Sequence, residues 1–171
     1  HYAALLILDP SSVATQRALR REAQLTDRLD RYASALAAAA DSAPDAARRV
    51  ALLNEAAMTL GELANGEDGA IELLSAALGT DGIGSADILN VGKRLNLLLD
   101  RADRHNERLT VLERLADAET VESSRRALIG DAAVLAEGLG EVDRALAAWR
   151  RRIESDAGDL RALEHLIELL G

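Results

Sequence analysis

Apolar residues recur at helical spacing along almost the whole chain, in stretches separated by short polar turns. Two of these stretches run Val50, Leu53, Ala57, Leu60, Ala64 and Val91, Leu95, Leu98, Ala102. A spacing of three and four residues places such side chains on one face of an α-helix. Each predicted helix therefore has an apolar face that a neighbouring helix must cover.

The predicted helices recur with a period that indicates repeated hairpins. Pro10 and Pro44 lie 34 residues apart, and each follows a helix rich in Ala and Leu. The second helix of each hairpin contains one large residue, and these residues recur at intervals of 34 to 38 positions: Tyr2, Leu36, Leu74, Leu112 and Trp149. Turns that contain Gly, Asn or Asp separate the two helices of each unit. Repeats of this length are typical of stacked helical hairpins.

A longer offset of 75 residues aligns one segment with another and supports the same repeat. The identical pairs are Leu53 with Leu128, Ala57 with Ala132, Leu60 with Leu135, Glu62 with Glu137, Asp68 with Asp143, Ala70 with Ala145 and Asp81 with Asp156. A single hairpin cannot cover both of its apolar faces, so neighbouring hairpins must stack into a solenoid. Small residues such as Ala57 and Ala132 then admit a large side chain from the adjacent helix, and leucine there should overpack the contact.

The boundaries of the repeats follow from these patterns. We expect one domain over residues 1–171, with units at 1–10 (partial), 11–44, 45–82, 83–119, 120–157 and 158–171 (partial). Residues 2–8 are predicted to form a second helix without its first. The last stretch is predicted to form a first helix without its second, with Leu160, Leu163, Ile167 and Leu170 at core spacing. Neither end has the polar cap of a complete solenoid. We therefore expect a fragment of a larger protein, or a chain whose ends pack against something else, such as a second copy.

Composition agrees with an all-helical chain and excludes several functions. Ala and Leu dominate and Phe is absent, as expected for helices rather than strands. The formal net charge of −9 argues against a general nucleic-acid surface, which needs a basic face. The absence of cysteine excludes disulfides and thiol chemistry. No apolar run is long enough for a membrane span; the compartment stays open, with the cytoplasm slightly favoured.

The unit from Leu128 to Ala157 resembles the tetratricopeptide repeat family. It has small residues midway along its first helix, a glycine at the turn, and then Ala145 and Trp149 in its second helix, with Ala157 where the family has a proline. The "DP" at Asp9 and the "SAPD" at Ser42 fit the family at earlier boundaries. The longer spacing in the middle units leaves open a related helical-repeat family or a degenerate array. The resemblance implies a right-handed superhelix of antiparallel hairpins that binds protein.

No residue pattern predicts catalysis, a cofactor or a metal. The three histidines lie far apart, and His165 is interpreted as a solvent-facing helix residue. The glycines at 79, 82 and 84 lack a preceding strand and the spacing of a phosphate loop. Acidic residues such as Glu62, Glu67 and Asp81, and the arginines at 150–152, are interpreted as solvated. The chain is therefore predicted not to be an enzyme.

The family resemblance implies a concave face lined by the first helices, which would bind a peptide or protein partner. The residues opposite the core stripe of each first helix are Arg17, Arg21, Gln24, Glu55, Thr59, Glu62, Asn90, Lys93, Arg94, Arg101, Asp131, Val134 and Glu137. Their sign alternates along the array, which favours register and partner selection more than affinity. Mixed charge at Arg17, Glu55 and Lys93 disfavours a clamp for a terminal carboxylate. The alternatives are an architectural or self-association segment, and a non-catalytic part of an enzyme.

Overall fold

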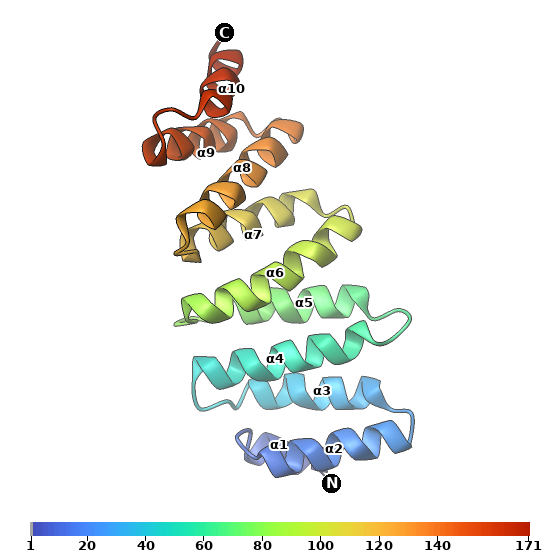
Figure 1. Cartoon of the computed structure of the whole chain (residues 1–171). Helices are drawn as coiled ribbons and strands as arrows, with labels where there is room; N and C mark the ends of the chain where they lie inside the picture. The colour runs from blue at the N-terminus through green and yellow to red at the C-terminus, as the bar shows by residue number, and fades with distance from the viewer. Residues whose placement is uncertain (1) are drawn as a thin grey trace. The chain divides into compact units, whose positions relative to one another are not determined.

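The computed structural model describes residues 2–171, and over this range it contains ten α-helices and no strand (Figure 1). The helices are α1 (Tyr2–Leu8), α2 (Val13–Leu25), α3 (Leu29–Ala40), α4 (Ala46–Gly61), α5 (Glu67–Leu78), α6 (Ser85–Arg101), α7 (His105–Ala118), α8 (Glu122–Gly138), α9 (Val142–Ser155) and α10 (Leu160–Leu170). The predicted all-α class is confirmed.

The chain divides into two compact units, and the boundary falls inside α6 between Leu95 and Asn96. In the first unit, α3 packs against α4 and α4 against α5, while α1 contacts α2 and α3. In the second unit, α7 packs against α8, α8 against α9 and α9 against α10. Within each unit, most packing joins helices that follow one another in the sequence and run antiparallel (Figure 1). Each unit thus consists of stacked antiparallel helical hairpins, as the sequence predicts.

Three turns that join a first helix to its second helix share one geometry. Asp27 and Asp103 have a φ of 54°, and Gly140 has a φ of 73°. The next N–H in each turn donates to the carbonyl five residues earlier: Arg28 to Ala23 at 2.8 Å, Arg104 to Leu99 at 2.9 Å and Glu141 to Ala136 at 2.9 Å. This left-handed residue and its hydrogen bond close the C-terminus of the first helix and reverse the chain.

The large residues predicted for the second helices are buried in four of the five helices concerned. Leu36, Leu74, Leu112 and Trp149 are at most 2% exposed. The prediction is wrong for Tyr2, which is 39% exposed. Leu6 is instead the buried residue of α1, because that side of the helix meets α2 and α3.

The apolar stripe predicted to form the core of α10 lies on its exposed face. Leu160, Ile167 and Leu170 are 72%, 71% and 65% exposed, and Leu163 is also exposed. A different face, with Ala162 fully buried and with Leu166 and Leu169 beside it, packs against the core of α8 and α9. Both stripes have helical spacing, so periodicity alone selected the wrong one.

Candidate functional site

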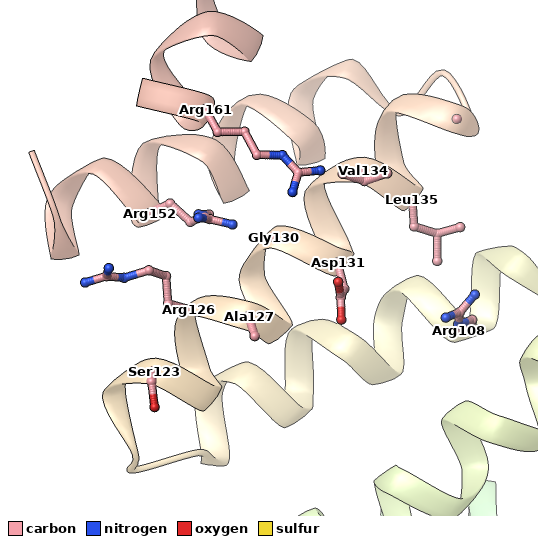
Figure 2. A pocket seen from close by; sticks show the side chains of 11 residues that line it. Arg108, Ser123, Arg126, Ala127, Gly130, Asp131, Val134, Leu135, Arg152 and Arg161 are labelled. Atoms are coloured by element: carbon pink, nitrogen blue, oxygen red, sulfur yellow. The ribbon is translucent and has the colours of Figure 1, made fainter. Parts of the chain in front are cut away.

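A groove in the second unit exposes one face of α8 and is bordered by arginine side chains (Figure 2). Its volume is ≈ 730 Å³. The residues that line this α8 groove are Arg108, Ser123, Arg126, Ala127, Gly130, Asp131, Val134, Leu135, Gly138, Arg152 and Arg161. All of these from Ser123 to Gly138 belong to α8, so one helix face forms the floor.

Gly130 lets an arginine lie close to the backbone of α8. A Cβ at this position would lie 2.3 Å from Nη1 of Arg152 and 3.4 Å from its Cζ. The first distance is too short for a side chain to be accommodated unless the guanidinium moves. The glycine therefore creates the space in which the Arg152 guanidinium crosses the floor of the groove (Figure 2).

Arg152 is fixed on its other edge by Asp159, the N-cap residue of α10. The Nε and Nη2 atoms of Arg152 donate to Oδ2 of Asp159 at 2.8 Å and 2.5 Å. The other carboxylate oxygen of Asp159 accepts the N–H of Ala162 at 3.1 Å. Burial raises the pKa of Asp159, but the Ala162 N–H and Arg152 outweigh it and lower that pKa. The pair thereby positions Arg152 and begins α10 with the same carboxylate.

The other three arginines differ in how far their charge is already compensated. Nη1 of Arg126 lies 2.9 Å from Oδ2 of Asp156, while its buried Nε has no acceptor. Arg108 is bonded to Asp100 and Asn96. Arg161 takes part in no ion pair or hydrogen bond within residues 2–171, and its side chain extends over the groove toward Val134 (Figure 2). Arg161 is thus the uncompensated cation of the groove.

Two residues of the predicted partner-binding face, Asp131 and Val134, lie in this groove. Glu137 is about one helical turn beyond Val134, yet it faces inward, where its Oε1 accepts the indole N–H of Trp149 and lies 3.1 Å from Nδ1 of His165. Arg101 is exposed elsewhere in the second unit. The structure therefore brings only part of the predicted set together.

His165 does not face solvent as predicted. Its ring stacks on Trp149 with centroids 4.4 Å apart and planes 11° apart, and the guanidinium of Arg152 lies 5.6 Å from the centroid of the same indole. The cluster of Glu137, Trp149 and His165 joins α8, α9 and α10. His165 therefore helps to attach α10 beside the groove.

In the first unit, the predicted face is partly exposed and partly used within the fold. Arg17, Arg21, Gln24, Asn90 and Lys93 are exposed and Arg94 is half-buried. Thr59 was expected on the exposed face, but it is only 2% exposed and its hydroxyl donates to the Glu55 carbonyl at 2.9 Å. It faces inward because α4 buries more than one face against α3 and α5.

Two acids of that face hold Arg20. The Nη1 of Arg20 lies 2.9 Å from Oε1 of Glu55 and its Nη2 lies 3.8 Å from Oε1 of Glu62. The Tyr32 hydroxyl also donates to Glu55 at 3.4 Å. Burial first, and the nearby Glu55 charge as well, raise the pKa of Tyr32. Glu55 is therefore committed to a contact between α2, α3 and α4.

The four arginines of the α8 groove suit the binding of a ligand. Arginine guanidinium groups supply fixed hydrogen-bond donors and charge, and they do not act as bases because they stay protonated. Within residues 2–171, no three His, Cys, Asp or Glu side chains are placed to hold a metal ion. In the same range, no helix combines the length and apolar character that crossing a bilayer requires.

One residue in the sequence, Gly130, could have indicated this groove, although the repeat pattern does not single it out. Gly130 stands in the middle of a predicted helix, where a glycine costs stability and commonly has a packing or functional reason. Arg126, Arg152 and Arg161 are far apart in the sequence, and their convergence depends on the packing of three helices. The predicted solvation of the arginines at 150–152 is wrong for Arg152, whose side chain is 15% exposed.

No protein-family model matches the chain, and no curated protein matches it by sequence. Two solved structures of MamA are similar in fold: one has 17% identity, covers 91% of this chain and 79% of that chain, and has a TM-score of 0.47. The other has 18% identity, covers 86% and 80%, and has a TM-score of 0.44. A thermophilic TPR protein of Thermus thermophilus has 15% identity over 99% of this chain and 87% of that chain, with a TM-score of 0.42.

Proposed function

We propose that this chain is a non-catalytic protein-interaction module that binds a peptide or a protein segment in the α8 groove. The supporting observation is an open cavity of ≈ 730 Å³ along one helix face, which lies in the size range of binding sites in proteins. Its floor is provided by small and apolar side chains, including Ala127 and Val134, and its border by charged ones. Such a surface offers apolar contact in the centre and polar selection around it.

Two features of the groove favour a macromolecular segment over a small metabolite. The groove is partly open to solvent rather than enclosed, so a ligand larger than the groove can bind with part of its chain outside it. Helix α8 rather than a loop supplies its floor, and the backbone hydrogen bonds of this floor are satisfied within the helix. Recognition therefore falls to side chains, as in other helical grooves that bind peptides.

The proposal is tested by selecting peptides from a random display library on the intact chain. Recovered peptides are then measured against Ala127→Gln, which fills the floor with an uncharged side chain that favours helix. Ala147→Gln is the matched control, because Ala147 is an exposed alanine on α9 outside the groove. We expect at least a tenfold loss of affinity with Ala127→Gln and none with Ala147→Gln. Peptides that bind both variants like the original chain would contradict the proposal.

A second candidate function, self-association, is favoured by the exposed stripe of α10. This apolar face consists of Leu160, Leu163, Ile167 and Leu170, and all of them except Leu163 are mostly accessible to solvent. Exposed apolar faces commonly mark association sites. Multi-angle light scattering over a concentration series should then show a dimer that Ile167→Gln and Leu170→Gln together convert to monomer. A monomer at the highest concentration would exclude this candidate.

A further inference from the structure

We propose that the segment bound in the α8 groove carries a carboxylate, which Arg152 and Arg161 hold above Gly130. This inference rests on the proposed function and names the chemistry of the ligand. It follows from three observations: the charge of the groove, the donors that remain free there, and the way Arg152 is held in place.

The charge of the groove is opposite to that of the chain. The chain has a formal net charge of −9, yet the lining of the groove contains four arginines and a single acid, Asp131. Three of the arginines are already bonded to Asp100, Asp156 or Asp159. Their charge is largely compensated, and Arg161 is left as the cation that a ligand anion can pair with.

Asp131 does not cancel the charge at this end of the groove. Its carboxylate points away from Arg152 and Arg161, on the side of the groove toward Arg108 (Figure 2). The groove thus has a cationic part at Arg152 and Arg161 and an acidic part at Asp131. A segment with one carboxylate at the first part fits this arrangement, whereas a polyanion that reached Asp131 would be repelled.

Hydrogen-bond donors remain free at the cationic part. Asp159 occupies Nε and Nη2 of Arg152, which leaves Nη1, the atom nearest Gly130. Arg161 has its whole guanidinium available. Both guanidinium groups lie over the same part of the groove (Figure 2). We therefore expect them to share one carboxylate through charge-assisted hydrogen bonds, which are about twice as strong as neutral ones.

The position of Arg152 is fixed before any ligand binds. Asp159 holds one edge of the guanidinium, and the indole of Trp149 lies 5.6 Å from its centre. Little side-chain freedom is then lost on binding, which lowers the entropic cost of association. A Cβ at Gly130 would lie 2.3 Å from Nη1, so a side chain there would displace the guanidinium from this position.

The inference is tested with four synthetic peptides that share an Ala/Ser background. The first has one central Glu and blocked ends, and the second has Gln in its place. The third has Gln and a free terminal carboxylate, and the fourth has phosphoserine instead of Glu. Binding to the intact chain is followed by NMR through the Nε–Hε signals of Arg152 and Arg161, and affinities are measured at low and at physiological salt.

We expect one of the two carboxylate peptides to bind at least tenfold more tightly than the blocked Gln peptide, and to shift both arginine signals. The peptide that does so tells a side-chain carboxylate from a terminal one. The preference should disappear in Arg161→Gln, fall in Gly130→Ala and persist in Arg150→Gln, an exposed arginine of α9 outside the groove. The salt increase should weaken carboxylate binding and leave the Gln peptide unchanged.

Equal binding of the carboxylate and Gln peptides, or a preference that survives in Arg161→Gln, would overturn the inference. Tighter binding of phosphoserine than of either carboxylate would also overturn it. If Ala127→Gln weakens all four peptides equally, the groove binds peptides without recognising a carboxylate and the proposed function stands. If the peptides bind and Ala127→Gln weakens none of them, the proposed function fails as well. If none of the four binds, the inference fails, and the display selection decides the proposed function.

Discussion

The bond between Arg152 and Asp159 makes a quantitative prediction about stability. Asp159→Asn keeps a side chain that caps a helix as well as aspartate does, so it removes the charge and preserves the cap. The two side chains are only 15% and 7% exposed, so solvent screens them weakly. A hydrogen bond to a charged group contributes about 1.5–3 kcal/mol. We therefore expect Asp159→Asn to lower the free energy of unfolding of the second unit by about 2 kcal/mol.

The assay is urea unfolding followed by the fluorescence of Trp149, the only tryptophan of the chain and a residue of the same unit. A double-mutant cycle with Arg152→Gln separates the pair from the contribution of each residue alone. We expect a coupling energy of about 1–2 kcal/mol. A loss below about 0.5 kcal/mol in Asp159→Asn would refute the reasoning, because it is the value of an ordinary surface pair.

The same pair predicts how stability depends on pH. The pKa of Asp159 is lowered in the folded protein, so its contribution is fully present above its unfolded pKa of about 3.9. The contribution is lost as the pH falls through the lower folded value. The difference in unfolding free energy between the original chain and Asp159→Asn should stay constant from about pH 7 to about pH 5 and shrink below about pH 4. A difference that grows on acidification would contradict this assignment.

Three further predictions concern packing and turns. Ala132→Leu should destabilise the second unit by about 1–3 kcal/mol, since Ala132 is buried in its core; an unchanged urea midpoint would contradict tight packing there. Gly140→Ala should lower the free energy of unfolding by about 1 kcal/mol, because Gly140 has a positive φ. The control Gly138→Ala, at the end of α8 with open space around it, should leave that free energy unchanged or raise it. Trp149→Ala should cost about 3–5 kcal/mol and remove hydrogen-exchange protection from α8–α10; protection also lost in α3–α5 would show that the two units unfold together.

The sequence was sufficient for the fold because most helices pack on their neighbours in the chain. Repeat spacing and helical periodicity follow from local contacts of this kind, and Leu36, Leu74, Leu112 and Trp149 are buried where the spacing placed them. Periodicity failed in α10, where a second apolar stripe shares the same spacing as the exposed one. Which stripe packs depends on how α10 meets α9, and a single helix sequence does not encode that rotation.

The candidate site was less predictable for a physical reason. The predicted face followed one rule, the side opposite the core stripe, and it includes Asp131 and Val134, which line the α8 groove. It failed at Thr59, because a threonine hydroxyl can bond to a carbonyl of its own helix and so be buried. It also failed at Glu137, whose carboxylate finds partners in Trp149 and His165 inside the fold. Arg152 and Arg161 come together only through the packing of α9 and α10, so their spacing in the sequence does not predict that they lie in one groove.

An NMR titration of the ¹⁵N-labelled intact chain with a peptide recovered from the display library shows directly whether the α8 groove is the binding surface. We expect the backbone amide signals of Gly130, Asp131 and Val134 to shift together and to saturate at one equivalent of peptide, while the signals of the outer face of α10 and of helices α2–α5 stay unchanged. Shifts centred on Leu163 and Ile167, or in the first unit, would place the binding surface elsewhere and contradict the account.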